Sequence, residues 1–411
     1  MGRRHRLGIV QTNRPKIRIT RGFGGDVVPR EPSFNLPFSD LGSGLVATTP
    51  IFAVGSGTPT FTRATVAWTK LASGLWTQVA SGSARSTYLG FNTAVGAYGG
   101  YYTEQAGTQL VTPAASIRDM TDAAWTKGAT ITATKTATGI DGAVNSCTTL
   151  TGGAVSATNT AFQTLVAAAS NRTYSCWIKR RTGTGTINIT QNGGSTYTDI
   201  TSQINASTFT RVSLTASVLN ATFGIQIVTN TDAIDVDFNQ FETGLFATSP
   251  MATAGVARHQ DVLYYSAAGN VAATSGTEYA EVTRPLATGD GVVISHNITI
   301  TPMYFRPSGQ KFMIYDGTTE FAYSSAVAAV IESVVKTANF WSAASNTMGG
   351  STNGGAVTTT TFDGLMVVSG TLNIGTNDNI SQSPWNGTIK NLRLWTTNLT
   401  ASQLVTLTAN G

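Results

Sequence analysis

Apolar and polar residues alternate in short segments along most of this chain, and glycine-containing turns separate the segments. A side-chain period of two is that of a β-strand with one buried face. Pairs such as Asn192-Gly193, Asp316-Gly317 and Asn386-Gly387 favour tight hairpins. The alternation predicts strands over residues 173–179, 210–214, 224–228, 234–238, 292–301, 312–315 and 388–394. The chain is therefore expected to be all-β, built as tandem antiparallel β-sandwiches.

Helical periodicity is confined to two segments. Residues 322–336 repeat apolar positions at helical spacing, but their β-branched side chains suit a strand equally well. Residues 401–407 are the second candidate for a helix.

A low content of charge accompanies this pattern. Only 11% of the 411 residues are charged, well below the usual share, whereas glycine and hydroxyl-bearing residues are abundant. So few charges leave a surface prone to association. We therefore expect neighbouring chains to cover much of it, in a homo-oligomer that is a dimer or a trimer.

The positive charge of the chain is concentrated at its N-terminus. The first thirty residues carry eight basic residues and one acid, and residues 31–411 carry 18 basic and 20 acidic residues. Interspersed apolar residues and Pro29, Pro32 and Pro37 favour an extended path. The segment is predicted to anchor the chain to an acidic partner, and a solvated tail is the alternative. The candidate anchoring residues are Arg3, Arg4, Arg6, Arg14, Lys16, Arg18 and Arg21.

Changes in composition divide the chain into four parts. We expect an extended basic arm with a Pro/Gly-rich continuation over residues 1–59, and a small β lead-in region over 60–115. Two separate sandwiches are then expected over 116–262 and 263–411. The chain shows no secretory signal and no apolar stretch long enough to span a membrane, so membrane insertion is not expected.

Motifs for catalysis, for cofactors and for metals are missing from the sequence. The three histidines lack partners at metal-ligand spacing, and no nucleophile elbow, phosphate loop or dinucleotide fingerprint occurs. No cofactor is expected. Cys147 and Cys176 lie among apolar residues, which favours buried free thiols. A disulfide between the two cysteines is the alternative.

Residues 234–239 and one tryptophan are the candidates for contact with a ligand. Strict alternation would place Asp235, Asp237 and Asn239 on one face, where they could bind Ca²⁺ or sugar hydroxyls, or form a solvated outer face. Trp177 is predicted to lie opposite the face of Tyr174, and its ring could stack on a sugar.

Paired carboxylates would support a different activity. Asp119, Asp122, Glu278 and Glu281 could cleave a glycosidic bond if they met across a cleft. Because any sequence contains carboxylates that could be paired in this way, the four residues are not specific evidence for a glycosidase. We therefore expect no enzymatic activity.

Two groups of motifs and one short segment match patterns of known modules. The first group consists of residues 120–127, 141–143, 174–179, 211–213, 238–242, 246–250 and 258–261, and over residues 115–261 it resembles a carbohydrate-binding jelly roll. The second consists of residues 372–375, 385–395 and 399–404, where Thr400 would cap a short helix, and it resembles the end of a laminin-G/concanavalin-like sandwich. The short segment is Phe61-Thr62-Arg63-Ala64-Thr65, which resembles the lead-in before the first module. Together these motifs resemble modules of virion proteins from tailed bacteriophages, of the head-spike and tail-fibre type.

The resemblance implies jelly-roll and concanavalin-like folds and a virion location, after synthesis in the host cytoplasm. It implies a structural protein that decorates the capsid or belongs to a head or tail fibre. Its partners would be capsid, tail or connector proteins, with host-surface glycans as ligands. A tailspike-like glycan-cleaving enzyme is one alternative. A nucleic-acid-binding protein is another, supported by the arm alone, since residues 31–411 supply no basic groove with interleaved aromatic residues.

Overall fold

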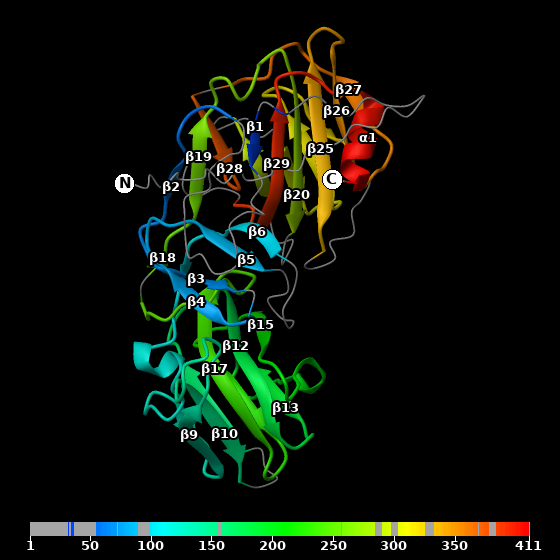
Figure 1. The fold of residues 1–411 in the computed structure, drawn as a ribbon. Helices are drawn as coiled ribbons and strands as arrows, with labels where there is room; N and C mark the ends of the chain where they lie inside the picture. The colour runs from blue at the N-terminus through cyan, green and yellow to red at the C-terminus, as the bar shows by residue number, and fades with distance from the viewer. Residues whose placement is uncertain are drawn as a thin grey trace, which may run out of the picture.

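Two β-sandwiches, one above the other in Figure 1, make up most of this computed structural model. The structure describes residue 32 and residues 34–36, 55–71, 73–88, 98–153, 158–255, 257–283, 290–296, 303–324, 333–368, 370–377 and 384–410. All pairings between the strands of these residues are antiparallel, which confirms the predicted all-β class. None of the described helices is long and apolar enough to cross a membrane.

The central sandwich consists of two five-stranded sheets, which we call the β12 sheet and the β16 sheet. Across the β12 sheet the strands are β15 (Thr210–Ser217), β12 (Asn171–Thr182), β17 (Ala233–Thr243), β10 (Cys147–Gly152) and β9 (Ile131–Ala137). Across the β16 sheet they are β14 (Thr198–Asp199), β13 (Ile187–Thr190), β16 (Thr222–Ile227), β11 (Thr160–Thr164) and β8 (Thr126–Lys127). Short 3₁₀ helices lie at Ala114–Ile117 and Thr201–Gln203.

Aromatic residues join the two sheets of the central sandwich. Phe223 of β16 stacks on Phe241 of β17 with ring centroids 4.3 Å apart, and contacts Tyr174 of β12 at 5.2 Å. These contacts identify the faces of β12 and β17 that point into the core. Large apolar side chains at alternate positions explain why these segments form strands of a sandwich.

The C-terminal sandwich has an eight-stranded β20 sheet and a seven-stranded β21 sheet. The path of the β20 sheet is β27 (Thr358–Thr361), β26 (Thr347–Thr352), β25 (Val335–Ser342), β20 (Ser275–Thr283), β29 (Gly387–Trp395), β6 (Tyr98–Thr103) and β5 (Arg85–Tyr88). The β21 sheet contains β2 (Thr60–Thr62), β19 (Val262–Ser266), β28 (Thr371–Ile374), β21 (Gly291–Ser295), β22 (Met303–Arg306), β23 (Lys311–Tyr315) and β24 (Glu320–Ala322).

The C-terminal helix α1 (Ala401–Asn410) lies against β25 and β26 and buries Leu404 and Leu407 there. The Thr400 hydroxyl accepts a hydrogen bond from the Gln403 amide at 3.3 Å, and the Gln403 side chain accepts one from the Thr400 amide at 2.9 Å. This reciprocal capping box confirms the predicted cap and fixes where the helix begins.

Strands of the lead-in take part in the C-terminal sandwich. β2 pairs with β19, and β6 pairs with β29, so the two large sheets both contain strands from residues 60–103. The sequence boundaries between domains stay predictions. Because β2 and β6 are strands of the two large sheets, this part of the lead-in belongs to the C-terminal sandwich.

The rest of the lead-in reaches the central sandwich. β3 (Ala67–Lys70) and β4 (Trp76–Val79) form a hairpin that lies between the two sandwiches in Figure 1. β7 (Gly107–Thr108) pairs with β18 (Ala257–Arg258), where the chain enters and leaves the central sandwich.

One segment of the predicted anchoring arm is a strand of this chain's own sheet. β1 (Phe34–Leu36) pairs with residues 392–394 of β29. Attachment of the basic arm to a partner stays a prediction, and the pairing adds that Phe34–Leu36 already contact this chain's own sheet. The edge of β29 beyond β6 offers unpaired backbone groups, and β1 satisfies them.

Candidate functional site

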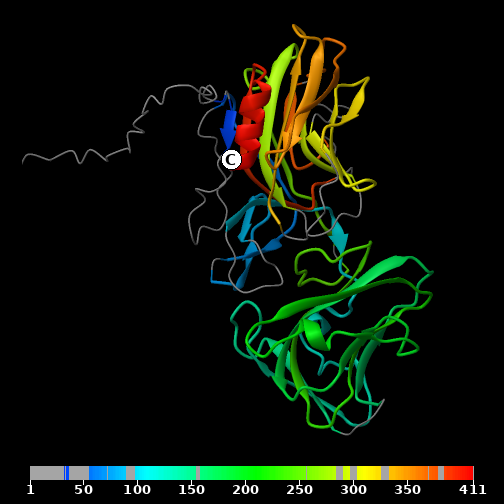
Figure 2. The same cartoon turned by 90° about the vertical axis from the view of Figure 1, so that its right-hand side faces the viewer.

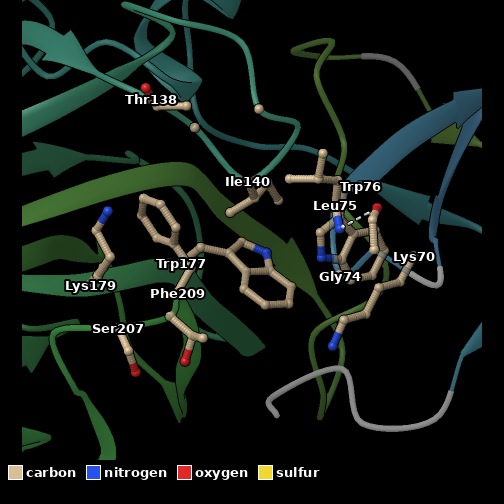
Figure 3. Close-up of a pocket in the computed structure, with 14 residues that line it drawn as sticks. Lys70, Gly74, Leu75, Trp76, Thr138, Ile140, Trp177, Lys179, Ser207 and Phe209 are labelled. Carbon is tan, nitrogen blue, oxygen red and sulfur yellow. Dashed lines mark hydrogen bonds between the residues drawn. The ribbon is translucent and has the colours of Figure 1, made fainter. Parts of the chain in front are cut away.

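A groove of about 310 Å³ lies where the β3–β4 hairpin meets the outer face of the β12 sheet (Figure 3). The hairpin provides Lys70, Leu75 and Trp76, and strand β12 provides Trp177 and Lys179. The remaining lining residues are Ser73, Gly74, Thr138, Gly139, Ile140, Gly142, Ser207, Thr208 and Phe209. The volume lies within the range of small-molecule sites, and the lining combines aromatic rings with hydroxyl groups.

Local hydrogen bonds hold the tip of the hairpin against the sandwich. The Leu71 amide donates to the Leu75 carbonyl at 2.8 Å, and Gly74 supplies the positive φ of 84° that the turn requires. The Trp76 amide then donates to the Ile140 carbonyl at 3.0 Å, across to the loop after β9. One wall of the groove is therefore fixed by backbone contacts.

Two tryptophans meet at the base of the groove. The rings of Trp76 and Trp177 are 5.2 Å apart and inclined at 63°, a favourable edge-to-face geometry. The Arg211 guanidinium lies 5.8 Å from the ring of Trp177. The indole Nε1 of Trp177 is buried and has no hydrogen-bond partner among the residues that the structure describes.

A second aromatic ring lies at the other side of Trp177. Phe209 is partly exposed, and the ammonium of Lys179 lies 5.0 Å from its ring centroid. Figure 3 shows Lys179 and Phe209 on one side of the Trp177 indole and Lys70 on the other. The groove thus presents the Phe209 ring and the Leu75 side chain to solvent above the buried Trp177, with polar groups at its rim.

Arg118 holds the loop that forms the upper wall. Its Nη1 and Nη2 atoms donate to both carboxylate oxygens of Asp141, at 2.7 and 2.9 Å. Its Nε and Nη2 donate to Asp237 at 2.8 and 2.9 Å, and the Ile140 amide donates to the same carboxylate at 2.9 Å. Burial raises the pKa of Asp237 above its usual range, although Arg118 opposes the shift. Bidentate pairs of this kind fix geometry, so the loop is well defined.

The predicted acidic residues lie at the back of this site and do not face solvent. Asp235 is 3% exposed and Asp237 is fully buried, which corrects the alternative of a solvated outer face. Asp235 accepts from the Thr149 hydroxyl at 2.7 Å and pairs with Arg181 at 2.9 Å and Lys179 at 3.5 Å. Their oxygens are thus engaged within the protein. Among the described residues no group of three or more His, Cys, Asp or Glu side chains could hold a metal ion.

Asn239 lies on the opposite face from the other two, contrary to the expectation from strict alternation. Its side chain accepts a hydrogen bond at 2.9 Å from the hydroxyl of Tyr174, inside the core. Phe238 adopts a positive φ of 45°, and the register between β12 and β17 shifts between Ser175 and Trp177. A bulge of this kind moves every later side chain to the other face.

Trp177 lies on the outer face of the β12 sheet, opposite Tyr174, as the alternation predicts. Neither Trp76 nor Lys70 was singled out from the sequence, and Phe209 was also missed. The only local signal for the hairpin was the pair of tryptophans at 68 and 76 around a Ser-Gly turn. Nothing in that signal indicates which sheet the hairpin would cover.

The four carboxylates considered for glycosidic cleavage are not brought together. Asp119 and Asp122 cap turns of the central sandwich through the amides of Thr121 and Ala124. Glu278 belongs to β20 of the C-terminal sandwich, is fully buried and lies 2.6 Å from His296. Glu281 is the fourth, and it accepts a hydrogen bond from Tyr279 at 3.0 Å. The four carboxylates are therefore divided between the two sandwiches, and each takes part in contacts within the chain.

Both cysteines are free and buried, which confirms the favoured interpretation and excludes the disulfide in this structure. Burial raises the pKa of the Cys176 thiol to about 12 and raises that of Cys147 as well. The seven candidate anchoring residues, from Arg3 to Arg21, lie outside the described residues.

No protein-family model matches the chain, and no curated protein sequence matches it. The solved structures that it resembles include a heptameric SAP-like pentraxin from Limulus polyphemus, with 19% identity, 34% of this chain and 72% of that chain covered, and a TM-score of 0.29.

Two further similar structures are described as carbohydrate-binding. One is the Ruminococcus gnavus IT-sialidase CBM40 bound to alpha2,3 sialyllactose, with 16% identity, 33% and 83% of the two chains covered, and a TM-score of 0.27. The other is a putative carbohydrate binding protein from Bacteroides ovatus, with 12% identity, 59% and 77% covered, and a TM-score of 0.30. At such TM-scores the likeness is remote, and the fold assignment rests on this chain's own strand pairing.

Proposed function

We propose that this chain is a structural protein of a tailed-bacteriophage virion that binds host-surface glycans through the groove beside Trp177. The observation that carries the glycan-binding role is a groove in which the partly exposed Phe209 ring lies beside Ser and Thr hydroxyls, over a base formed by the buried Trp76 and Trp177. Aromatic rings stack on the apolar faces of sugars, and hydroxyl groups match their polar edges. No catalytic role is proposed, because Asp119 and Asp122 belong to one sandwich and Glu278 and Glu281 to the other.

The virion role is supported by the sequence motifs described above. Arg63 belongs to the lead-in motif, and Asp261 ends the motifs of the first module. The two residues form a buried salt bridge, so the two motifs are in contact in the fold. Low surface charge supports a further part of the proposal, that the chain is a dimer or trimer in the particle. The basic N-terminal arm is proposed to attach it to a capsid, tail or connector protein.

Glycan binding is tested with the purified full-length chain on a glycan array, followed by calorimetry with each hit. Leu75→Ser changes a 42%-exposed residue at the tip of the hairpin, and Phe209→Ala removes the partly exposed ring. We expect both to weaken binding. Leu219→Ser, at a 64%-exposed position that does not line the groove, is the matched control and should bind as the unchanged chain does.

The absence of any glycan hit, or equal binding by all four proteins, would refute the groove as a glycan site. A reducing-sugar assay on host polysaccharide tests the non-catalytic part of the proposal. Release of oligosaccharide by the pure protein would overturn it in favour of a tailspike-like enzyme.

The virion role is tested by deleting residues 2–30 and measuring incorporation into particles. The deletion removes seven net positive charges and leaves β1 in place. Loss of incorporation supports attachment through the arm, and incorporation at the unchanged copy number contradicts it. Light scattering of the purified chain tests the oligomer, and a monomer at high concentration would contradict that part.

A further inference from the structure

Four consecutive threonines form one edge of the β20 sheet. β27 (Thr358–Thr361) is the last strand of this sheet and, among the described strands, pairs with β26 alone. The side chains of Thr358, Thr359 and Thr361 are exposed. The strand contains neither a charged residue nor a proline. Such an edge offers backbone N–H and C=O groups to a strand of another chain.

The other edges of the large sheets carry more protection against such pairing. In the described part of the chain, the four sheets of the two sandwiches have eight terminal strands, and β27 is one of them. Of the remaining seven, β2 has only three residues, and the other six contain a charged residue, namely Arg85, Lys127, Lys135, Asp199, Arg211 or Glu320. Charges and short edge strands prevent sheets from joining edge to edge. β27 is therefore the longest of these terminal strands without a charge.

The pairing of β27 with β26 fixes which backbone groups point outward. The Phe362 amide donates to the Asn346 carbonyl at 3.1 Å, and this is the next pair in register after β27 ends. Hydrogen-bonded and non-hydrogen-bonded pairs alternate along an antiparallel ladder. The N–H and C=O groups of Thr360 therefore point towards β26, and those of Thr359 and Thr361 point away from it.

The outward edge of β27 is complementary to itself. If two copies meet across a two-fold axis at Thr360, Thr359 of each copy lies opposite Thr361 of the other. Every outward amide can then donate to an outward carbonyl of the other copy. Threonine lies opposite threonine throughout, a favourable cross-strand pair, and no charge is brought against its own copy. A second copy of this chain therefore fits the edge.

We infer that β27 is an interface between two copies of this chain, in which two β20 sheets join into one continuous antiparallel sheet. The inference deepens the proposed function and rests on it, because the oligomer proposed there is a dimer or a trimer, and β27 names the surface and selects the dimer. Figures 1 and 2 show the orange strands β26 and β27 in the upper sandwich, whereas the groove lies at the central sandwich. Association and glycan binding can therefore be measured independently.

Sedimentation equilibrium of the purified full-length chain at increasing concentration tests the interface. We expect a reversible dimer. Thr360→Lys places two ammonium groups directly opposite each other across the axis, and should weaken association by roughly tenfold or more. Thr360→Glu should have the same effect. An equimolar mixture of the two variants should restore the dimer, because each pair at the axis then has opposite charges.

A proline variant tests the backbone hydrogen bonds. Thr359→Pro removes an outward N–H and leaves the bonds to β26 in place, since proline is tolerated on edge strands where its nitrogen faces solvent. We expect it to abolish the dimer, and thermal unfolding of the variant checks that it is folded. Thr136→Lys is the matched control, because this exposed threonine belongs to β9, an edge strand that already contains Lys135. It should associate as the unchanged chain does.

Four outcomes would overturn the inference. A dimer of unchanged strength in Thr360→Lys and Thr359→Pro would place the contact on another surface and leave the proposed oligomer intact. A trimer of the unchanged chain would do the same, because two edges that pair across a two-fold axis close as a dimer. A mixture of the lysine and glutamate variants that stays monomeric would refute the axis at Thr360. A monomer at every concentration would refute both the interface and the proposed oligomer, and the glycan array would still test the groove.

Discussion

Arg63 and Asp261, 198 positions apart in the sequence, form a salt bridge of 2.8 Å in which both side chains are completely buried. Arg85 pairs with the second oxygen of the same carboxylate and with Glu104 at 2.8 Å, and Arg258 lies 3.0 Å from Glu104. Lead-in residues and the segment that connects the two sandwiches thus share one ionic network. Its position at the junction explains how the sandwiches are joined.

Removing one charge from this network should destabilise the protein strongly. Arg63→Met leaves Asp261 with one partner fewer in a fully buried site, and we expect a loss of about 3 to 5 kcal/mol. Equilibrium denaturation with urea measures it. The control is Arg306→Met, because Arg306 forms a partly exposed pair with Glu320 and should cost less than about 1 kcal/mol. An equal loss of unfolding free energy in Arg63→Met and Arg306→Met would contradict a special contribution of the buried network to stability.

Glu104 should make the junction sensitive to acid. Burial alone would raise its pKa, but Arg258, Arg85 and Ser249 together lower it to about 2. Because the pKa in the folded protein lies below that of the unfolded chain, the stabilisation is complete above about pH 4.5 and is lost as the pH falls towards 2. The shift corresponds to about 3 kcal/mol.

The variant Glu104→Gln isolates this contribution. At pH 7 it should unfold at a lower urea concentration than the unchanged protein, and the difference should shrink between about pH 4.5 and 2. Burial raises the pKa of Asp237 and Glu242, so these two groups favour the folded state more as the pH falls, opposite to Glu104. A difference that stays constant down to pH 2 would contradict the assignment to Glu104.

The two thiols should be unreactive until the protein unfolds. Burial raises the pKa of Cys176 to about 12, and the Cys147 thiol is shifted in the same direction, so thiolate is scarce at pH 8. We expect no reaction with a colorimetric thiol reagent in the native protein and two equivalents in denaturant. One rapidly reacting thiol in the native state would contradict the burial of both.

Gly139 should tolerate no side chain. A Cβ atom there would collide with Arg118, Asp237 and Ser146, the groups that hold the loop at the upper wall of the groove. Gly139→Ala should therefore cost about 1 to 3 kcal/mol and weaken glycan binding. Gly370→Ala is the control, because nothing lies within 4 Å of its added Cβ, and its stability should change by less than about 0.5 kcal/mol. Thermal unfolding measures the stability of both variants, and an equal change in the two would contradict the predicted collision at Gly139.

The pairing of β1 with β29 predicts different effects for two truncations. Deletion of residues 2–30 leaves β1 intact and should not change the free energy of unfolding. Deletion of residues 2–40 also removes Phe34–Leu36 and should cost roughly 1 to 2 kcal/mol, the value of a few backbone hydrogen bonds. Identical stability of the two truncated chains, measured in urea, would contradict the pairing.

Local features of this protein could be predicted from the sequence because they depend on residues that are close in the chain. The strand pattern, the burial of both cysteines and the cap of α1 at Thr400 are of this kind. So is the outward direction of Trp177, which follows from alternation within one strand. The all-β class follows from the same period, since it requires only that one face of each strand be buried.

Tertiary structure alone decided where the site lies. The bulge at Phe238 moves Asn239 into the core, and it depends on pairing with β12, about sixty residues earlier in the chain. The groove exists because a hairpin from the lead-in covers part of the β12 sheet, so that residues of β3, β4 and β12 line one groove. Contacts between such distant segments are selected by packing and charge over the whole fold, and alternation within one strand carries no information about them.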